Sequence, residues 1–175
     1  MSKPRPPEAV KLLVSNIYKD GDLLKDIVQA LSANYGDIDF ATSRAAFHYT
    51  DYYEEEMGSP LDRRFVFFRD LISPESLPDV KLCTNAIEEQ TSILGKRKAN
   101  IDPGYISQAH LILATGKGYT HRPYLRDGIY ADLTLVYKGK SFQSLPWTYP
   151  DYGEKESIKM FNKVRARYLM QLRGE

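Results

Sequence analysis

The chain of 175 residues has 42% hydrophobic and 27% charged residues and a formal net charge of +1. This composition is ordinary for a globular domain, and a charge near zero gives no overall attraction to nucleic acid or anionic lipid. The single cysteine excludes an intramolecular disulfide, and no run of about 18 apolar residues predicts a transmembrane helix. We therefore expect one cytoplasmic domain over residues 1–175, with a flexible, proline-rich tail at residues 1–8.

The first half of the chain is predicted to contain strands and two helices. Residues 10–18 are almost continuously apolar, which is typical of a central strand. A helix is predicted next, capped near Asp20 and ended by Gly36, because apolar residues recur between them at intervals of three and four. Two strands and a second helix are expected further along, over residues 38–49, 64–71 and 79–94.

The second half is predicted to be rich in strands. Three strands and a final helix are expected over residues 106–115, 128–138, 140–143 and 154–172. This order of elements indicates an α+β fold, with a mixed, mainly antiparallel sheet and helices packed on one face. We expect a ferredoxin-like βαββαβ core with an added hairpin and a C-terminal helix.

Motifs for nucleotide binding and phosphoester chemistry are absent or incomplete. Gly139-Lys140-Ser141 resembles the end of a P-loop, but Thr134 stands where that loop needs glycine. No GxGxxG fingerprint occurs in the chain. His48-Tyr49-Thr50 matches a short element that two-histidine phosphoesterases use in pairs, and a second copy is missing. The sequence therefore predicts no particular reaction, and whether the protein is an enzyme stays open.

A basic segment over residues 116–126 is the strongest candidate for a binding site. It has no acidic residue and four residues that carry or can carry positive charge, Lys117, His121, Arg122 and Arg126. Arginine matches the oxygens of phosphate or carboxylate, lysine adds a point charge, and histidine exchanges protons near neutral pH. The segment is either an anion-binding loop or a solvated loop that pairs with the acidic residues 51–56. Those acids are in turn either solvated or ligands for a divalent cation.

Two C-terminal segments suggest other kinds of binding. The last predicted helix has a basic residue at every fourth position, Lys155, Lys159, Lys163 and Arg167. This stripe is either an exposed face or a contact for nucleic acid or a membrane. For RNA, Tyr130 in a predicted strand is a residue that could stack on bases. The aromatic segment around Trp147 either covers a sheet edge or forms a patch for a protein partner.

Several motifs together resemble one family. They are TDYYEEEMG, the strand with Arg63-Arg64-Phe65, LCTNAIEE, NIDPGY, HRPYLRDGIYADLTL and PWTYPDY. On these motifs the chain resembles, from about Val10 to Arg173, the uncharacterised prokaryotic family named domain of unknown function 4416, for which no activity is established. The resemblance implies a shared set of polar residues, carried here by Glu56, Arg64, Asn85, Glu88, Asn100, Asp102, Tyr105, Lys117, His121, Arg122, Tyr124 and Asp132.

This mixture of carboxylates, amides and cations resembles a binding or catalytic pocket. The catalytic candidates are His121, Asp132 and Glu88. The ligand-binding candidates are Arg64, Asn85, Asn100, Asp102, Tyr105, Lys117, Arg122 and Tyr124. The expected ligand is a phosphorylated or carboxylated small molecule, a class that includes nucleotides, and phosphate hydrolysis or transfer is the reaction to test. The alternatives are an RNA-binding module and a non-catalytic interaction domain. No metal ligands, cofactor, membrane contact or oligomeric state are predicted, although carboxylates in the set are compatible with a divalent cation.

Overall fold

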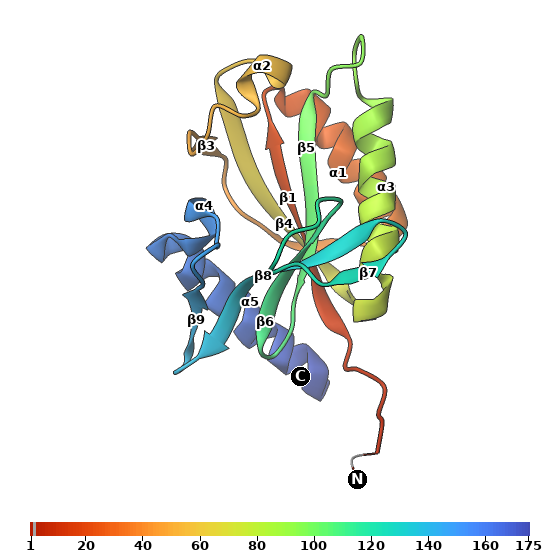
Figure 1. Cartoon of the computed structure of the whole chain (residues 1–175), viewed down its shortest axis with the longest axis vertical. Coiled ribbons are helices and arrows are strands. Elements are labelled where there is room, and N and C mark those ends of the chain that lie inside the picture. The colour runs from red at the N-terminus through yellow and green to blue at the C-terminus, as the bar shows by residue number, and fades with distance from the viewer. Residues whose placement is uncertain (2) are drawn as a thin grey trace.

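The computed structural model describes residue 1 and residues 3–175 (Figure 1). Of the predicted tail over residues 1–8, Ser2 lies outside the described residues, and the others form no helix or strand. The flexibility of this tail stays a prediction. No helix in the described part of the chain is long and apolar enough to cross a membrane.

The described residues form one sheet of nine strands and five α-helices, which confirms the predicted α+β class. The strands are β1 (Val10–Tyr18), β2 (Ile38–Ala41), β3 (Ala45–Phe47), β4 (Leu61–Ile72), β5 (Ala99–Ile106), β6 (His110–Thr115), β7 (Tyr124–Arg126), β8 (Ile129–Lys138) and β9 (Ser141–Ser144). The helices are α1 (Gly21–Tyr35), α2 (Glu54–Met57), α3 (Leu77–Gln90), α4 (Pro150–Gly153) and α5 (Lys155–Arg173), with a short 3-10 helix at Pro74–Ser76.

The strand order is β2-β4-β1-β5-β6-β8-β7, with β3 beside β4 and β9 beside β8. Every pairing between named strands is antiparallel, which confirms the mainly antiparallel sheet. β1 lies near the centre and is buried at all nine of its residues, as its almost continuous apolar character predicted. The ferredoxin-like arrangement stays a prediction.

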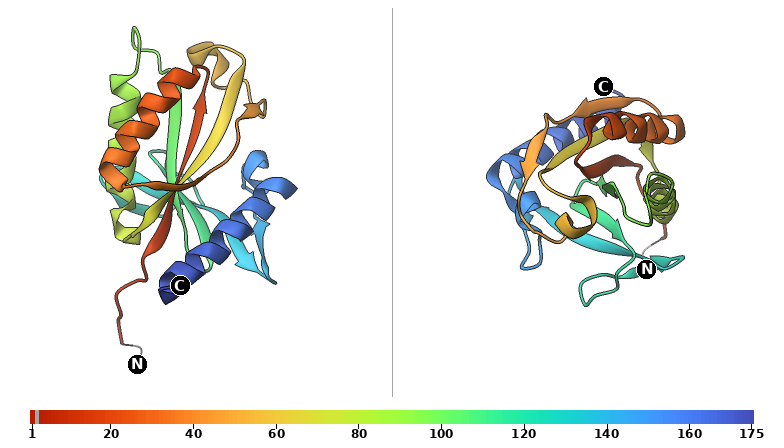
Figure 2. Two further views of the ribbon diagram at one scale, coloured as in Figure 1. Left: turned by 180° about the vertical axis from the view of Figure 1, so that it is seen from behind. Right: turned by 90° about the horizontal axis from the view of Figure 1, so that it is seen from above.

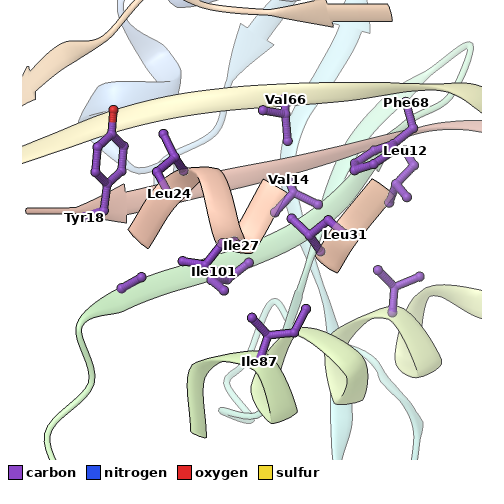
Figure 3. Packing of buried hydrophobic residues seen from close by; sticks show 12 residues of the cluster. Leu12, Val14, Tyr18, Leu24, Ile27, Leu31, Val66, Phe68, Ile87 and Ile101 are labelled. Carbon is purple, nitrogen blue, oxygen red and sulfur yellow. The ribbon is translucent and has the colours of Figure 1, made fainter. Parts of the chain in front are cut away.

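Helices α1 and α3 pack together against one face of the sheet. The Asp20 side chain accepts a hydrogen bond from the backbone of Asp22 at the start of α1, and Gly36 ends the helix with a φ of 83° that favours glycine. Figure 3 shows Ile27 and Leu31 of α1 between the sheet and α3. Each fully buried side chain of this size contributes about 1.5–3 kcal/mol, so this cluster fixes α1 firmly.

Helix α5 packs on the opposite face of the sheet (Figure 2). The prediction that the helices pack on one face is therefore wrong. Its buried Phe161 and Tyr168 contact the cluster formed by Leu13 and Phe67, whose side chains point away from α1. The physical reason lies in β1, which is apolar at consecutive positions. Such a strand exposes apolar side chains on both faces unless each face is covered.

The sheet divides between β5 and β6. β5 pairs with β1 along its whole length, but with β6 only from Gly104 to Ile106. Gly104 lies where the two strands separate, and a Cβ at this position would collide with the Ile112 carbonyl oxygen and with Leu113. Glycine therefore permits the close approach of the two backbones. The N-terminal half of β5 is left with a free edge inside the sheet.

Candidate functional site

A pocket of about 420 Å³ lies beside this free edge, within the size range of small-molecule sites. Its floor is the sheet, to which β1, β4, β5, β6 and β8 contribute Ile17, Arg63, Asp102, Leu113 and Asp132. Its walls are rich in tyrosine and come from two segments distant in the sequence, with Tyr49, Tyr52, Tyr53, Tyr149 and Tyr152.

Two charged side chains of α3 satisfy the free edge of β5. The backbone amide of Ile101 donates to Glu88 Oε1 at 2.5 Å, and Lys81 Nζ donates to the Ile101 carbonyl oxygen at 3.1 Å. These side chains replace the ladder bonds that β6 would otherwise make. Burial raises the pKa of Glu88, although Lys81, the Ile101 amide and Arg97 act in the opposite direction. Glu88 itself does not line the pocket.

Asp102 presents a carboxylate to the pocket. Lys81 Nζ donates to its Oδ1 at 3.1 Å, and Asn100 Nδ2 donates to its Oδ2 at 2.6 Å. The Asp102 side chain is 34% exposed. Burial favours the neutral acid, but the charge and hydrogen bond of Lys81, with the bond from Asn100, outweigh it and hold the pKa of Asp102 below its ordinary value. Asp102 is therefore an ionised acceptor on the pocket floor.

Arg97 links the floor of the pocket to its wall. Its Nε and Nη2 donate to the Glu56 carboxylate at 2.7–3.1 Å, and its Nη1 donates to Asn100 Oδ1 at 3.1 Å. Glu56 belongs to α2, which directly follows the wall residue Tyr53. The hydrogen bonds from Arg97 lower the pKa of Glu56. Arg97 was not among the predicted site residues, because nothing in its local sequence distinguishes it from the lysines beside it.

Arg63 is a second charged residue of the pocket that was not among the predicted site residues. Its Nε and Nη2 donate to Ser15 Oγ at 3.1 and 2.9 Å, and its Nη1 forms an ion pair with Asp151. The guanidinium carbon lies 4.4 Å from the centre of the Phe65 ring, within cation–π range. The predicted residue was its neighbour Arg64, whose Nε donates to the Thr42 carbonyl oxygen and which does not line the pocket.

Asp132 is held by the basic segment over residues 116–126. Arg122 Nε donates to Asp132 Oδ2 at 2.8 Å, while the other nitrogens of Arg122 donate to the Lys117 carbonyl oxygen and to the Tyr149 hydroxyl. His121 stacks on Trp147 with ring centres 4.7 Å apart, and its buried Nε2 lies 3.6 Å from Asp132 Oδ2. Arg122 therefore donates its hydrogen bonds to other residues of the protein, and its bond to Asp132 holds this segment against β8.

Lys117 lies at the exposed rim of the pocket. Its Nζ donates to the Tyr52 hydroxyl at 3.2 Å and lies 5.0 Å from the centre of the same ring. No carboxylate among the described residues forms an ion pair with it. Burial raises the pKa of Tyr53, and the nearby charge of Asp102 adds to this effect. The rim thus has a cation without an acidic partner, and the interior has neutral phenols.

The structure brings together only part of the predicted set. Asp102, Lys117 and Asp132 line the pocket, and His121, Arg122, Asn100 and Glu88 lie behind them. Four other candidates lie elsewhere. Arg64 supports β2, exposed Asn85 lies on α3, Tyr105 packs in an apolar cluster with Leu77, and Tyr124 is 59% exposed on β7.

The remaining interpretations of the sequence concern the acidic loop and the aromatic segment. Among residue 1 and residues 3–175, no group of three or more His, Cys, Asp or Glu side chains is arranged to hold a metal ion. Within the acidic loop, Glu56 is bound to Arg97.

In the aromatic segment Trp147 donates from its ring nitrogen to the Leu133 carbonyl oxygen at 2.8 Å, and Tyr152 is buried. Trp147 and Tyr149 are 40% and 46% exposed, so the segment contacts β8 and also presents aromatic surface. A patch for a protein partner stays a prediction.

The fold and pocket define an α+β protein with one antiparallel sheet, whose candidate site lies on the face that also carries α4 and α5. The chain matches the family model described as domain of unknown function (DUF4416) over residues 8–168. It therefore belongs to this family, which confirms the resemblance inferred from its motifs. No curated protein and no solved structure matches the chain.

Proposed function

We propose that the protein binds a small phosphorylated or carboxylated molecule in the tyrosine-lined pocket, with nucleotides as the class that fits best. The observation that carries the proposal is the pairing of two features in one pocket. An ionised acceptor, Asp102, lies on the floor, and Lys117, a cation with no acidic partner in the described part of the chain, lies at the rim. A ligand with polar hydrogen-bond donors at one end and an anionic group at the other matches both.

The charge distribution favours an anionic group at the rim. Arg63 and Arg122 are both paired with carboxylates inside the protein. Among residue 1 and residues 3–175, Lys117 has only the Tyr52 hydroxyl and ring as partners of its ammonium, which is therefore free to bind phosphate or carboxylate oxygens. This differs from the anion site inferred from the sequence, where Arg122 was expected to bind the ligand directly.

The tyrosine walls favour a planar ring in the ligand. Aromatic side chains stack on bases of any sequence and contribute about 1–3 kcal/mol per base. The walls also contain phenol groups, which both donate and accept hydrogen bonds. A nucleotide combines a planar ring, polar donors and a phosphate, and so uses all three features of the pocket.

Hydrolysis or transfer of the phosphate is the reaction to assay on any ligand that binds. Asp102 and Asp132 are the carboxylates on the pocket floor, and His121 is the imidazole behind Asp132. A carboxylate or imidazole within reach of the ligand supplies the proton acceptor that such a reaction needs. Release of inorganic phosphate from a bound nucleotide would support an enzymatic function.

The test is isothermal titration calorimetry with nucleotides, their nucleosides, sugar phosphates and dicarboxylates. Lys117→Ala should weaken binding of a nucleotide about 10- to 100-fold, because a hydrogen bond to a charged group contributes about 1.5–3 kcal/mol. Binding of the matching nucleoside should change less than threefold. Lys25→Ala, a matched change at an exposed position of α1, should leave both affinities unaltered. A panel without any binding compound, or equal losses for nucleotide and nucleoside, would refute the proposal.

A further inference from the structure

A second region with unbalanced charge lies on α5, on an outer surface separate from the pocket. Lys155, Lys159, Lys163 and Arg167 recur every four residues, which is a rise of about 6 Å along the helix for each step. All four are exposed. Among the described residues only Lys159 has an acidic partner, Glu156 at 3.8 Å. The whole chain has a net charge of +1, so this concentration of positive charge is local.

Two hollows flank this row of charges. One lies between α5 and the start of β9 and has a volume of about 510 Å³, and the other lies between α5 and β2 with about 310 Å³. Lys159 and Lys163 line both hollows and so form the ridge between them. A flexible chain that lies on this ridge can contact either side.

The β8–β9 hairpin adds charge and is fixed to the helix. Asn162 Nδ2 of α5 donates to Ser141 Oγ, and Asn162 Oδ1 accepts a hydrogen bond from the backbone of Phe142, both at 2.9 Å. The turn of this hairpin exposes Lys138 and Lys140. These lysines extend the positive surface beyond α5 on a rigid support.

The hollow beside β2 contains an aromatic side chain. Phe40 is partly exposed and lines this hollow, and the Arg167 guanidinium lies 5.9 Å from the centre of its ring. A positive ridge next to an aromatic ring and an arginine is the combination that proteins use to hold single-stranded nucleic acid. Tyr130, the residue considered for stacking from the sequence, instead packs against Tyr124 with ring centres 5.3 Å apart.

We infer that α5, β2 and the β8–β9 hairpin form a surface that binds the phosphate backbone of single-stranded nucleic acid, with Phe40 stacking on a base. An anionic membrane is the less suitable partner, because insertion into lipid needs exposed apolar side chains beside the lysines. Met170 is the one exposed large hydrophobic residue of α5. This inference is independent of the ligand proposed for the pocket.

The experiment is fluorescence anisotropy with a labelled 20-nucleotide RNA of mixed sequence, titrated at several salt concentrations. The four basic residues of α5 and the two hairpin lysines provide six phosphate contacts, which predict a slope of about −4.2 for log K against log salt. Lys159→Ala/Lys163→Ala should reduce the slope to about −2.8 and, with affinities equal to wild type at about 1 M salt, weaken binding about 60-fold at about 50 mM salt. Phe40→Leu should weaken binding about fivefold without a change in slope.

The control is Lys25→Ala/Lys96→Ala, which removes the same net charge at exposed positions away from α5. It should retain RNA affinity within about threefold of wild type. Equal losses in both double variants would mean that only overall charge matters and would overturn the inference. Absence of RNA binding at 50 mM salt would also overturn it, as would binding to phosphatidylserine vesicles without binding to RNA. Lys117→Ala should bind RNA as wild type does, which separates this surface from the pocket.

Discussion

Arg97 offers the sharpest test of how the pocket is held together. Its guanidinium binds Glu56 of α2 and Asn100 of β5, and Nη1 lies 3.4 Å from the buried carboxylate of Glu88. The change Arg97→Ala removes all of these contacts from one position. We therefore expect it to destabilise the protein and to loosen the wall around Tyr53.

The size of this destabilisation follows from how exposed Arg97, Glu56 and Asn100 are. Arg97 and Glu56 have side chains 29% and 30% exposed, so their ion pair is discounted for screening and contributes about 1 kcal/mol. Asn100 is 5% exposed, and loss of its hydrogen bond leaves an unpaired acceptor that costs about 1–2 kcal/mol. Together the free energy of unfolding should fall by about 2–3 kcal/mol, equivalent to a decrease of roughly 4–12 °C in Tm.

The loss of stability caused by Arg97→Ala should depend on pH. The hydrogen bonds from Arg97 lower the pKa of Glu56 in the folded protein. A carboxyl with a lowered folded pKa contributes stability above its unfolded pKa of about 4.3, and that contribution is lost as the pH falls through the folded value. The difference between wild type and Arg97→Ala should therefore be largest near pH 7 and should narrow below about pH 4.

Urea unfolding at pH 7 and at pH 3.5 measures both quantities. A double-mutant cycle with Glu56→Ala isolates the ion pair and should give a coupling energy of about 1 kcal/mol at pH 7. Arg69→Ala serves as the control, because Arg69 forms a similar but exposed ion pair with Asp37. A loss below 0.5 kcal/mol for Arg97→Ala at pH 7, or a loss that does not change with pH, would refute this reasoning.

Two further predictions concern buried groups around the pocket. Arg122→Ala should lower the free energy of unfolding by about 3 kcal/mol, because it leaves buried Asp132 without its cation, and Arg122→Ala/Asp132→Asn should recover at least half of this loss in urea titrations. Full stability of the single variant would contradict the ion pair. Burial raises the pKa of Tyr152 to about 12, so its share of the 295 nm absorbance, measured against Tyr152→Phe, should appear near pH 12. Because this folded pKa exceeds the unfolded value of about 10, the associated stability is present below pH 10 and lost as the pH rises toward 12. A midpoint at pH 10 would show that the phenol is solvated.

Most of the longer strands and helices were predictable because their apolar residues repeat with the period of each element. Strand β5 was not predicted, because Asp102, Pro103 and Gly104 interrupt its apolar residues. The almost continuous apolar character of β1 identified it as a central strand, and Asp20 and Gly36 marked the ends of α1. The face of the sheet that α5 covers was harder to predict. Its apolar stripe indicated that it packs on the sheet, but periodicity within a helix does not indicate which face of the sheet it covers.

The candidate site was predictable only in part, for two physical reasons. Arg63 and Arg64 are adjacent on a strand buried on both faces, and side chains alternate between those faces. Arg63 and Phe65 lie on the same face of β4, so alternation would assign Arg63 to the side of the sheet that α5 covers. Alternation does not indicate that this side has a pocket. The tyrosines at positions 49–53 and 149–152 meet through long-range strand pairing, which leaves no local signal.

The division of the sheet explains why polar residues of such different kinds occur together among the predicted site residues of this chain. Where β6 leaves β5, the backbone groups of Ile101 need new partners, and Glu88 and Lys81 supply them. Lys81 also binds Asp102, so the same side chain supports the strand edge and fixes the carboxylate of the pocket floor. Some of these charges thus preserve the opening in the sheet, while Asp102 and Lys117 face the space that the opening provides. Buried charges that replace ladder bonds are costly to lose, and their role in structure therefore accounts for part of what the sequence presented as a catalytic set.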